Sequence, residues 1–286
     1  WDQRRDSLLL ARDRLGKKPL YYAQTPEGLS FASELGALML DGSISRQLDP
    51  VAIDEYLNYL FVPHPRTVYR QARKLPPATV AVFADGKLTT RRYWQVNYST
   101  TEKVPDEEAA VDHLQELLEV AVRRRLEADV PLGAFLSGGL DSSLVVALMR
   151  RVGGQQVKTF SIGFSEADFN ETDYAREVAQ ALGTEHREHI VDFQIEALLP
   201  TLLRHCGEPF ADSSAIPLYH LSRLTRGEVT VALSGDGGDE VFGGYRRYQA
   251  GMLAGYFNQP LAAPLRHSAA FLGRHMGEPA TYFGHS

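Results

Sequence analysis

The sequence predicts an α/β protein in two parts, and three observations support this prediction. Beyond residue 107, apolar runs of strand length alternate with runs of helical periodicity, a pattern typical of a parallel sheet with helices on both faces. Residues 1–98 show short strands between turn residues, with two helical segments among them, which indicates an α+β region. The length of 286 residues also favours two domains over one.

The N-terminal part contains five short runs that we expect to form strands, at residues 8–11, 19–23, 29–32, 79–83 and 88–94. Asp85-Gly86, between the last two runs, is a strong hairpin signal. Ser33 is expected to cap a helix over residues 34–40. Asp49-Pro50 combines a favourable N-cap with a residue that fits the first helical position, so a second helix is expected over residues 51–60.

A polar linker is expected at residues 99–106, and a long amphipathic helix begins at its end. Apolar residues of this helix recur at i, i+3, i+4 and i+7: Ala110, Leu114, Leu117, Leu118, Ala121, Val122 and Leu126. Three arginines at residues 123–125 complement the dipole at its C-terminus. Strands are then expected at 130–136, 157–164, 185–191 and 229–233, and helices at 143–151, 173–182, 195–204 and 216–224. In such sheets ligands bind beyond the carboxyl ends of the strands.

Composition excludes several classes of function. The chain has 30 basic and 36 acidic residues and a formal charge of −6, which does not indicate a nucleic-acid or membrane surface. No apolar run reaches the length of about 18 residues needed to span a bilayer, and no signal peptide opens the sequence, so the cytoplasm is the expected location. Cys206 is the single cysteine, which excludes an intrachain disulfide and a cysteine-based zinc cluster.

Ser-Gly-Gly-Leu-Asp-Ser-Ser, at residues 137–143, lies between an expected strand and an expected helix. Glycines allow close approach of a phosphate, and a helix N-terminus and serine hydroxyls supply hydrogen-bond donors. The Asp141 carboxylate would repel that anion unless a divalent cation lay between them, so the loop predicts a phosphate site with Mg²⁺. The common P-loop is excluded because no lysine precedes Ser142. The alternative is a turn that merely closes a strand–helix unit.

Ser-Gly-Asp-Gly-Gly-Asp-Glu, at residues 234–240, is a second candidate site. Three carboxylates among glycines repel one another unless they serve a cation, a cationic substrate group or a proton transfer. The alternative is a glycine-rich turn with solvated acids. The fold places this loop and Asp141 at the same edge of one sheet, which favours a shared site.

Two further features are less specific on their own. Phe-Ser-Ile-Gly-Phe, at residues 160–164, ends the strand after the phosphate loop and could supply an apolar slot for adenine, although taken alone it is a buried strand. His186 and His189 flank an expected strand without the helical spacing of a zinc protease, so packed or solvated imidazoles are expected.

The loop at 137–143 resembles the pyrophosphate loop, S-G-G-x-D-S-[ST], of the ATP pyrophosphatases. Together with five other segments it resembles the synthetase domain of glutamine-hydrolysing asparagine synthetases; these segments are residues 123–126, 129–133, 170–175, 208–214 and 234–245. Upstream, residues 12–22, 31–35, 75–77 and 92–94 resemble the closing part of that family's glutaminase domain, an N-terminal-nucleophile fold. Ala78 stands where the family pattern usually has glycine.

The resemblance implies the fold and the domain bounds. Residues 107–286 would form an adenine-nucleotide alpha-hydrolase-like (ATP pyrophosphatase) domain, truncated at its C-terminus, and residues 1–98 the C-terminal portion of the glutaminase domain with its hairpin. Both ends of the chain are expected to be cut, and Cys206 lies in the wrong domain to be the glutaminase nucleophile. This chain is therefore not expected to hydrolyse glutamine.

The resemblance also implies the site residues. ATP and pyrophosphate would be bound by Phe135, Ser137, Gly138, Gly139, Leu140, Asp141, Ser142, Ser143, Ile162, Ser234 and Gly235. Asp141 and Asp239 would hold Mg²⁺ and, with Asp236, serve the chemistry. Asp236 stands where well-known members carry glutamate, and its shorter side chain leaves its role open.

The implied activity is that of a ligase that uses ATP and Mg²⁺. Aspartate would be converted to β-aspartyl-AMP and pyrophosphate, and ammonia, derived from glutamine in the full-length protein, would displace AMP to give asparagine. Two alternatives stay open: amidation of another carboxylate, as in β-lactam synthetases and amidotransferases of polysaccharide clusters, or a nucleotide-binding fragment without turnover. The expected partners are these small molecules, with neither nucleic acid nor membrane, and a homodimer is left open.

Overall fold

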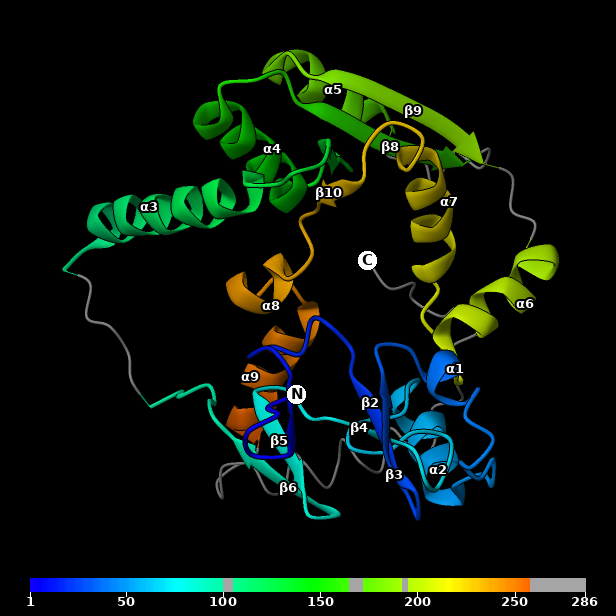
Figure 1. The fold of residues 1–286 in the computed structure, drawn as a ribbon. Coiled ribbons are helices and arrows are strands. Elements are labelled where there is room, and N and C mark those ends of the chain that lie inside the picture. The colour runs from blue at the N-terminus through cyan, green and yellow to red at the C-terminus, as the bar shows by residue number, and fades with distance from the viewer. Residues whose placement is uncertain (100–104, 165–171, 192–194, 258–286) are drawn as a thin grey trace.

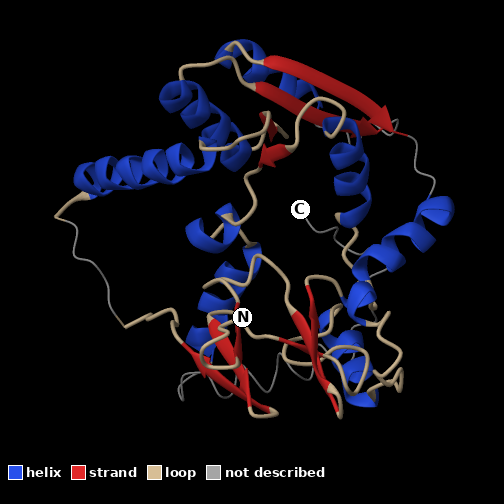
Figure 2. Ribbon diagram, viewed as in Figure 1, coloured by secondary structure: helices blue, strands red, loops and turns tan. Residues whose placement is uncertain are grey.

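The computed structural model describes residues 1–99, 105–164, 172–191 and 195–257. Its described strands form three sheets (Figure 2). Two antiparallel sheets of three strands belong to the N-terminal part, and a parallel sheet of four strands belongs to the C-terminal part. The predicted α/β class with a parallel sheet is confirmed.

The N-terminal sheets have the strand orders β1-β5-β6 and β3-β2-β4. Their strands are β1 (Ser7–Ala11), β2 (Tyr21–Thr25), β3 (Gly28–Ala32), β4 (Arg73–Lys74), β5 (Thr79–Ala84) and β6 (Lys87–Arg92). The hairpin between β5 and β6 is confirmed, because Asp85 and Gly86 both have positive φ angles, 49° and 70°, as a tight two-residue turn requires. The two-residue strand β4 was not predicted.

Two helices accompany these sheets, α1 (Leu35–Leu38) and α2 (Pro50–Tyr59). The predicted cap of α2 is confirmed, because the Asp49 side chain accepts a hydrogen bond from the Val51 amide at 3.1 Å. The predicted cap of α1 is wrong. Glu34 occupies the N-cap position without a side-chain bond, and α1 is a single turn whose Leu35 and Leu38 are buried, so packing determines where it starts.

The C-terminal sheet has the order β10-β7-β8-β9, with all pairs parallel. Its strands are β7 (Leu132–Phe135), β8 (Lys158–Phe164), β9 (Glu185–Val191) and β10 (Val231–Leu233). The accompanying helices are α3 (Glu107–Leu126), α4 (Leu140–Gly153), α5 (Thr172–Leu182), α6 (Ile195–Cys206), α7 (Ala215–Thr225), α8 (Gly238–Phe242) and α9 (Arg246–Phe257). Figure 1 shows α5 and α7 on opposite faces of β8 and β9, so the predicted two-sided arrangement is confirmed.

Some bounds differ from those predicted. α4 begins at Leu140, three residues earlier than expected, because the glycine loop itself turns directly into the helix. α8 and α9 were not predicted. The predicted start of α3 is confirmed, since Asp106 accepts from the Ala109 amide at 2.9 Å. Its apolar stripe is less buried than expected, and Val122 is the one residue of α3 described as buried.

The core of the C-terminal part lies between the sheet and helices α4 and α5. It includes Leu136, Val146, Met149, Ala175 and Leu233. These residues fix the strand ends relative to the start of α4, and both predicted loops emerge from this edge of the sheet.

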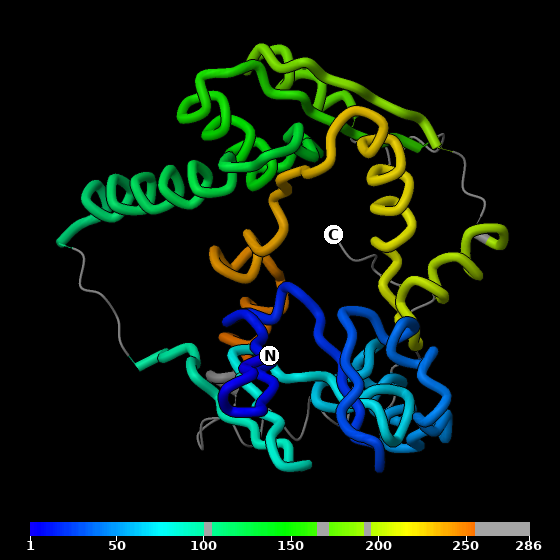
Figure 3. Tube along the Cα trace, in the orientation of Figure 1, coloured from blue at the N-terminus to red at the C-terminus, as the bar shows by residue number. Residues whose placement is uncertain are grey.

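Beyond the linker, the chain returns to the N-terminal part once more (Figure 3). After α6, residues 207–214 run beside the N-terminal part before α7 returns to the sheet, and α6 lies against α1. Residues 100–104, most of the predicted linker, lie outside the described residues. Among the described helices, we find none long and apolar enough to cross a membrane.

Candidate active site

A cavity of about 420 Å³ lies at the carboxyl ends of β7, β8 and β10. Ten of the predicted site residues line it: Phe135, Ser137, Gly139, Leu140, Asp141, Ser142, Ile162, Ser234, Gly235 and Asp236. They come from three separate strand ends, which the parallel topology brings to one edge of the sheet.

The loop at 137–143 is held by the hydroxyl group of Ser142. This oxygen lies 2.9 Å from Ser137 Oγ and accepts from the Ser137 amide at 3.3 Å. It also donates to the Gly139 carbonyl at 3.2 Å. The loop therefore supports itself, and the first amides of α4, which have no acceptor within their own helix, are available to an anion.

The loop at 234–240 packs directly against Asp141. A β-carbon added at Gly238 would lie 2.3 Å from the Asp141 carboxylate, and one added at Gly235 would lie 2.7 Å from the Ser142 amide nitrogen. At Gly235 the neighbouring atom belongs to the backbone, so only glycine allows this approach; at Gly238 a side chain would displace the Asp141 carboxylate. Asp236 faces the cavity, and its carboxylate accepts a hydrogen bond from Ser234 Oγ at 2.9 Å.

Three predicted site residues do not line the cavity: Gly138, Ser143 and Asp239. Gly138 has a φ angle of 81° and packs against the backbone of Tyr174 and Ala175 in α5. Ser143 Oγ is buried without a hydrogen-bond partner in the described structure. Asp239 lies in the first turn of α8 with its carboxylate against Gly244.

The donor set fits a phosphate-bound Mg²⁺ better than a metal cage made by protein alone. Within the described residues, no group of three or more His, Cys, Asp or Glu side chains could hold a metal. Mg²⁺ commonly takes one or two carboxylates together with substrate phosphates and water. Asp141, which lies against the loop that contains Asp239, offers carboxylate oxygens of this kind beside the first amides of α4.

Comparison with known proteins identifies the family. The family model "Asparagine synthase" matches residues 113–285, and that of a glutamine amidotransferase domain matches residues 1–94. The chain belongs to the asparagine synthase family. It is 36% identical to glutamine-hydrolysing asparagine synthetase 1 of Bacillus subtilis. The alignment of 253 residues covers 87% of this chain and 39% of that protein.

A second asparagine synthetase of Bacillus subtilis, number 3, is 32% identical over 267 residues, 86% of this chain and 42% of that protein. The chain thus spans about two fifths of the length of these curated relatives. A solved NH3-dependent NAD synthetase from Campylobacter jejuni has a TM-score of 0.34 and 16% identity, over 47% of this chain and 60% of that one. That likeness is too weak to carry an argument.

In this member of the family, sequence reasoning missed the wall of the cavity that α7 provides. This wall consists of Ser214, Pro217, Leu218 and Leu221. Their spacing, i, i+3, i+4 and i+7, is that of one helix face and could have indicated it. Leu136, Ser161, Phe164 and Ala175 also line the cavity without having been predicted as site residues.

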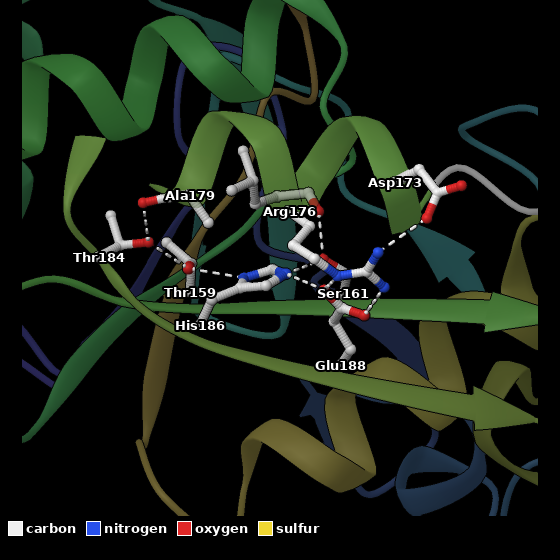
Figure 4. A network of polar contacts seen from close by, with 9 residues as sticks. Thr159, Ser161, Asp173, Arg176, Ala179, Thr184, His186 and Glu188 are labelled. Atoms are coloured by element: carbon white, nitrogen blue, oxygen red, sulfur yellow. Dashed lines mark hydrogen bonds and ion pairs between the residues drawn. The ribbon is translucent and has the colours of Figure 1, made fainter. Parts of the chain in front are cut away.

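Ser161 connects the cavity to a polar network around His186 (Figure 4). Its hydroxyl donates to the Leu136 carbonyl at 2.7 Å and therefore accepts from His186 Nε2, 3.2 Å away. The other ring nitrogen, Nδ1, lies 2.9 Å from Thr159 Oγ1, which itself lies 2.9 Å from Thr184 Oγ1. Through Ser161, His186 of β9 is thus connected to the backbone immediately before the loop at 137–143.

Charged residues border the network on its outer side. Glu188 Oε1 lies 3.4 Å from His186 Nε2. Arg176 of α5 donates to both carboxylate oxygens of Glu188, at 3.0 and 2.6 Å, and to Asp173 at 2.8 Å (Figure 4). Burial lowers the pKa of His186, and the Glu188 charge opposes that shift. The imidazole is a packed, hydrogen-bonded group, one of the two settings predicted for it.

Proposed function

We propose that this chain catalyses ATP-dependent amide synthesis. Aspartate would be adenylated on its side-chain carboxylate to β-aspartyl-AMP, with release of pyrophosphate, and ammonia would then convert the intermediate to asparagine and AMP. The observation that carries the proposal is the meeting of the loop at 137–143 with the acidic loop at 234–240 around one cavity. The names of the relatives, glutamine-hydrolysing asparagine synthetases, support the choice of substrate.

The first step needs ATP held with its α-phosphorus open to attack. We assign the pyrophosphate to Ser137, Gly139, Ser142 and the N-terminus of α4, and the adenosine to Phe135 and Ile162. A carboxylate oxygen of aspartate attacks the α-phosphorus, and pyrophosphate leaves with the electron pair of the broken bond. Catalysis here rests on positioning and on stabilising charge.

Asp141 and Asp239 would hold Mg²⁺, which neutralises phosphate charge when it is bound; Asp239, whose carboxylate lies against Gly244 outside the cavity lining, would have to turn towards Asp141 to do so. Asp236 faces the cavity from the second loop, and we assign it to the amination step. There, ammonia attacks the acyl carbon, loses a proton and expels AMP. The bond from Ser234 orients the Asp236 carboxylate, which could accept that proton.

We assign residues 1–98 to the glutaminase side of the protein, with a linker at 99–106 before the synthetase part. The match of residues 1–94 to a glutamine amidotransferase domain supports this division. In the whole protein, glutamine would supply the ammonia. In an assay of this chain, ammonia is added directly.

The test is the release of pyrophosphate from Mg-ATP by the purified chain with ammonia present. Release that depends on aspartate supports the proposal. If pyrophosphate release depends on another carboxylic acid and aspartate has no effect, that acid is the substrate and the proposed type of reaction still holds. Binding of ATP without pyrophosphate release under any of these conditions would contradict the proposal.

A further inference from the structure

Lys74 and Glu208 form a buried ion pair between the two parts of the chain. Lys74 lies in β4 and Glu208 in the segment between α6 and α7, and their side chains are only 14% and 9% exposed. The Lys74 ammonium group also donates to the Val62 carbonyl. The second carboxylate oxygen of Glu208 accepts from the Val68 amide at 3.2 Å. Both charged groups are thus paired and hydrogen-bonded.

Backbone contacts surround this pair. The Ala211 amide donates to the Leu60 carbonyl at 2.9 Å. Gly207, with a φ angle of 71°, packs so closely on α1 that an added β-carbon would lie 3.2 Å from the Gly36 amide nitrogen. The segment therefore lies directly on the N-terminal part, as the path in Figure 3 indicates.

Such a pair has a large cost if either partner is lost. Burial raises the pKa of Glu208, and the Lys74 charge opposes that rise. A lysine or glutamate left alone in this setting would hold an uncompensated charge away from water. Removal of one partner should therefore destabilise the docked arrangement of residues 207–214.

The same segment ends at the cavity. Asp212 accepts from the Ser214 amide at 2.9 Å, and this turn leads directly into α7. Ser214 is the first residue of the cavity wall that continues with Pro217, Leu218 and Leu221. Glu208 of the ion pair and Ser214 of the cavity wall are thus only six positions apart in the sequence.

We propose that the Lys74–Glu208 pair is a positioning contact, which holds Ser214 and α7 against the cavity by anchoring residues 207–214 to the N-terminal part. This inference rests on the proposed function for its substrate. The ATP contacts assigned above come from β7, β8 and the two loops. We therefore assign the α7 wall to the binding of the aspartate substrate. The synthetase pocket would then be complete only when the amidotransferase part is docked.

The experiment compares Lys74→Met, Glu208→Gln and the double variant in the full chain. Met keeps the length of the lysine stem, and Gln keeps an acceptor for the Val68 amide. Each single variant should raise the KM for aspartate by about 5- to 20-fold at saturating Mg-ATP and ammonia, with kcat changed less than about threefold. The double variant should be no worse than the poorer single one, because both remove the same contact. Lys74→Arg, which keeps the charge, should restore most of the wild-type KM.

Hydrogen exchange of residues 207–221 gives a readout that is independent of turnover. Exchange there should be faster in Lys74→Met and Glu208→Gln than in the wild type, whereas residues 140–153 should be unchanged. Glu55→Gln is the control. It removes an ion pair that lies wholly within the N-terminal part, in which Glu55 Oε2 is 3.5 Å from Arg66 Nε. This variant should change neither the KM nor the exchange.

Unchanged KM and unchanged exchange in both single variants would overturn the inference, as would equal effects of Glu55→Gln. If the wild-type chain releases no pyrophosphate with aspartate, the proposed function fails, and the exchange measurement alone then decides the positioning role. Faster exchange confined to 207–221 supports that role, and equal exchange contradicts it. A Lys74→Met variant that fails to fold leaves the decision to the nearly isosteric Glu208→Gln.

Discussion

The turn at residues 12–18 and the loop at residues 137–143 both carry conspicuous motifs, but their hydrogen bonds are used differently. In the turn, Arg12 donates to three backbone carbonyls, those of Lys18, Leu75 and Gly16, at 2.7 to 2.9 Å. Asp13 accepts from the amides of Lys18 and Lys17, which lowers the pKa of its carboxyl group. In the loop, the serines bond to one another while the start of α4 faces a cavity.

The difference separates a motif whose donors are used by the fold from one whose helix amides stay available to the ligand that we propose. The donors of Arg12 end on protein carbonyls, so this turn joins β1 to the segment before β5. The amides at the start of α4 have no such partners within their helix. The two sequence motifs are equally distinctive and do not reveal this difference. The acceptor that each hydrogen-bond donor reaches in the structure does reveal it.

The largest effect on activity is expected from replacing Asp141. A large loss of activity would support the proposal that the loop at 137–143 binds a ligand. Asp141→Ala should lower pyrophosphate release by at least about 100-fold, because a carboxylate beside the phosphates is lost. Thermal unfolding should change little. Asp112→Ala, on the exposed face of α3, is the control and should keep wild-type activity. An Asp141→Ala variant with full activity would remove Asp141 from the site.

The two glycines Gly138 and Gly86 test how tightly the site loop is packed. Both have positive φ, 81° and 70°, but a β-carbon would lie 2.6 Å from the Ala175 amide nitrogen at Gly138 and in open space at Gly86. Gly86→Ala should destabilise by about 1–2 kcal/mol, and Gly138→Ala by about 2–5 kcal/mol, since α5 must also move. Urea unfolding measures both, and equal costs would contradict the packing argument.

Arg12→Met tests the fold-building side. It removes three charge-assisted hydrogen bonds and should lower the free energy of unfolding by about 1–3 kcal/mol. The dissociation constant for ATP should stay within about twofold of wild type, because no ligand contact is lost. Calorimetric titration and chemical unfolding would check the two expectations. Weaker ATP binding with unchanged stability would reverse the assignment of the turn.

The smallest effect is expected from the network behind the loop. The folded-state pKa of His186 lies below its ordinary value of 6.5, so the unfolded chain binds a proton first as pH falls. Stability from this group is therefore fully present above pH 6.5 and is lost as pH falls towards the folded pKa. His186→Gln should show a smaller fall in Tm between about pH 7.5 and 5.5 than wild type. His205→Gln, at an exposed position, should match wild type.

Local signals in the sequence predicted much of the fold. Asp85-Gly86 located the hairpin, Asp49-Pro50 located α2, and the strand expected at 185–191 is β9 with its observed bounds. The two loops were correctly expected at one sheet edge because parallel strands share the same direction. The hairpin, α2 and β9 each depend on residues close together in the sequence.

Features that depend on distant partners were missed. β4 consists of Arg73 and Lys74, which carry no strand pattern and become a strand through pairing with Tyr21 and Tyr22. The α7 wall and the partner of Glu208 likewise depend on tertiary contacts. Ser33 was mistaken for a cap, because burial of Leu35 outweighs capping preference in so short a helix.

The bond from the Val68 amide to Glu208 joins residues 140 positions apart. A contact of this kind closes a very long loop, whose entropy must be overcome before the contact contributes any stability. The β5–β6 hairpin and the β7–α4–β8 unit need no such closure and should form early. The junction should therefore be among the last parts of the molecule to assemble, so that α7 reaches its final position only after both cores have folded.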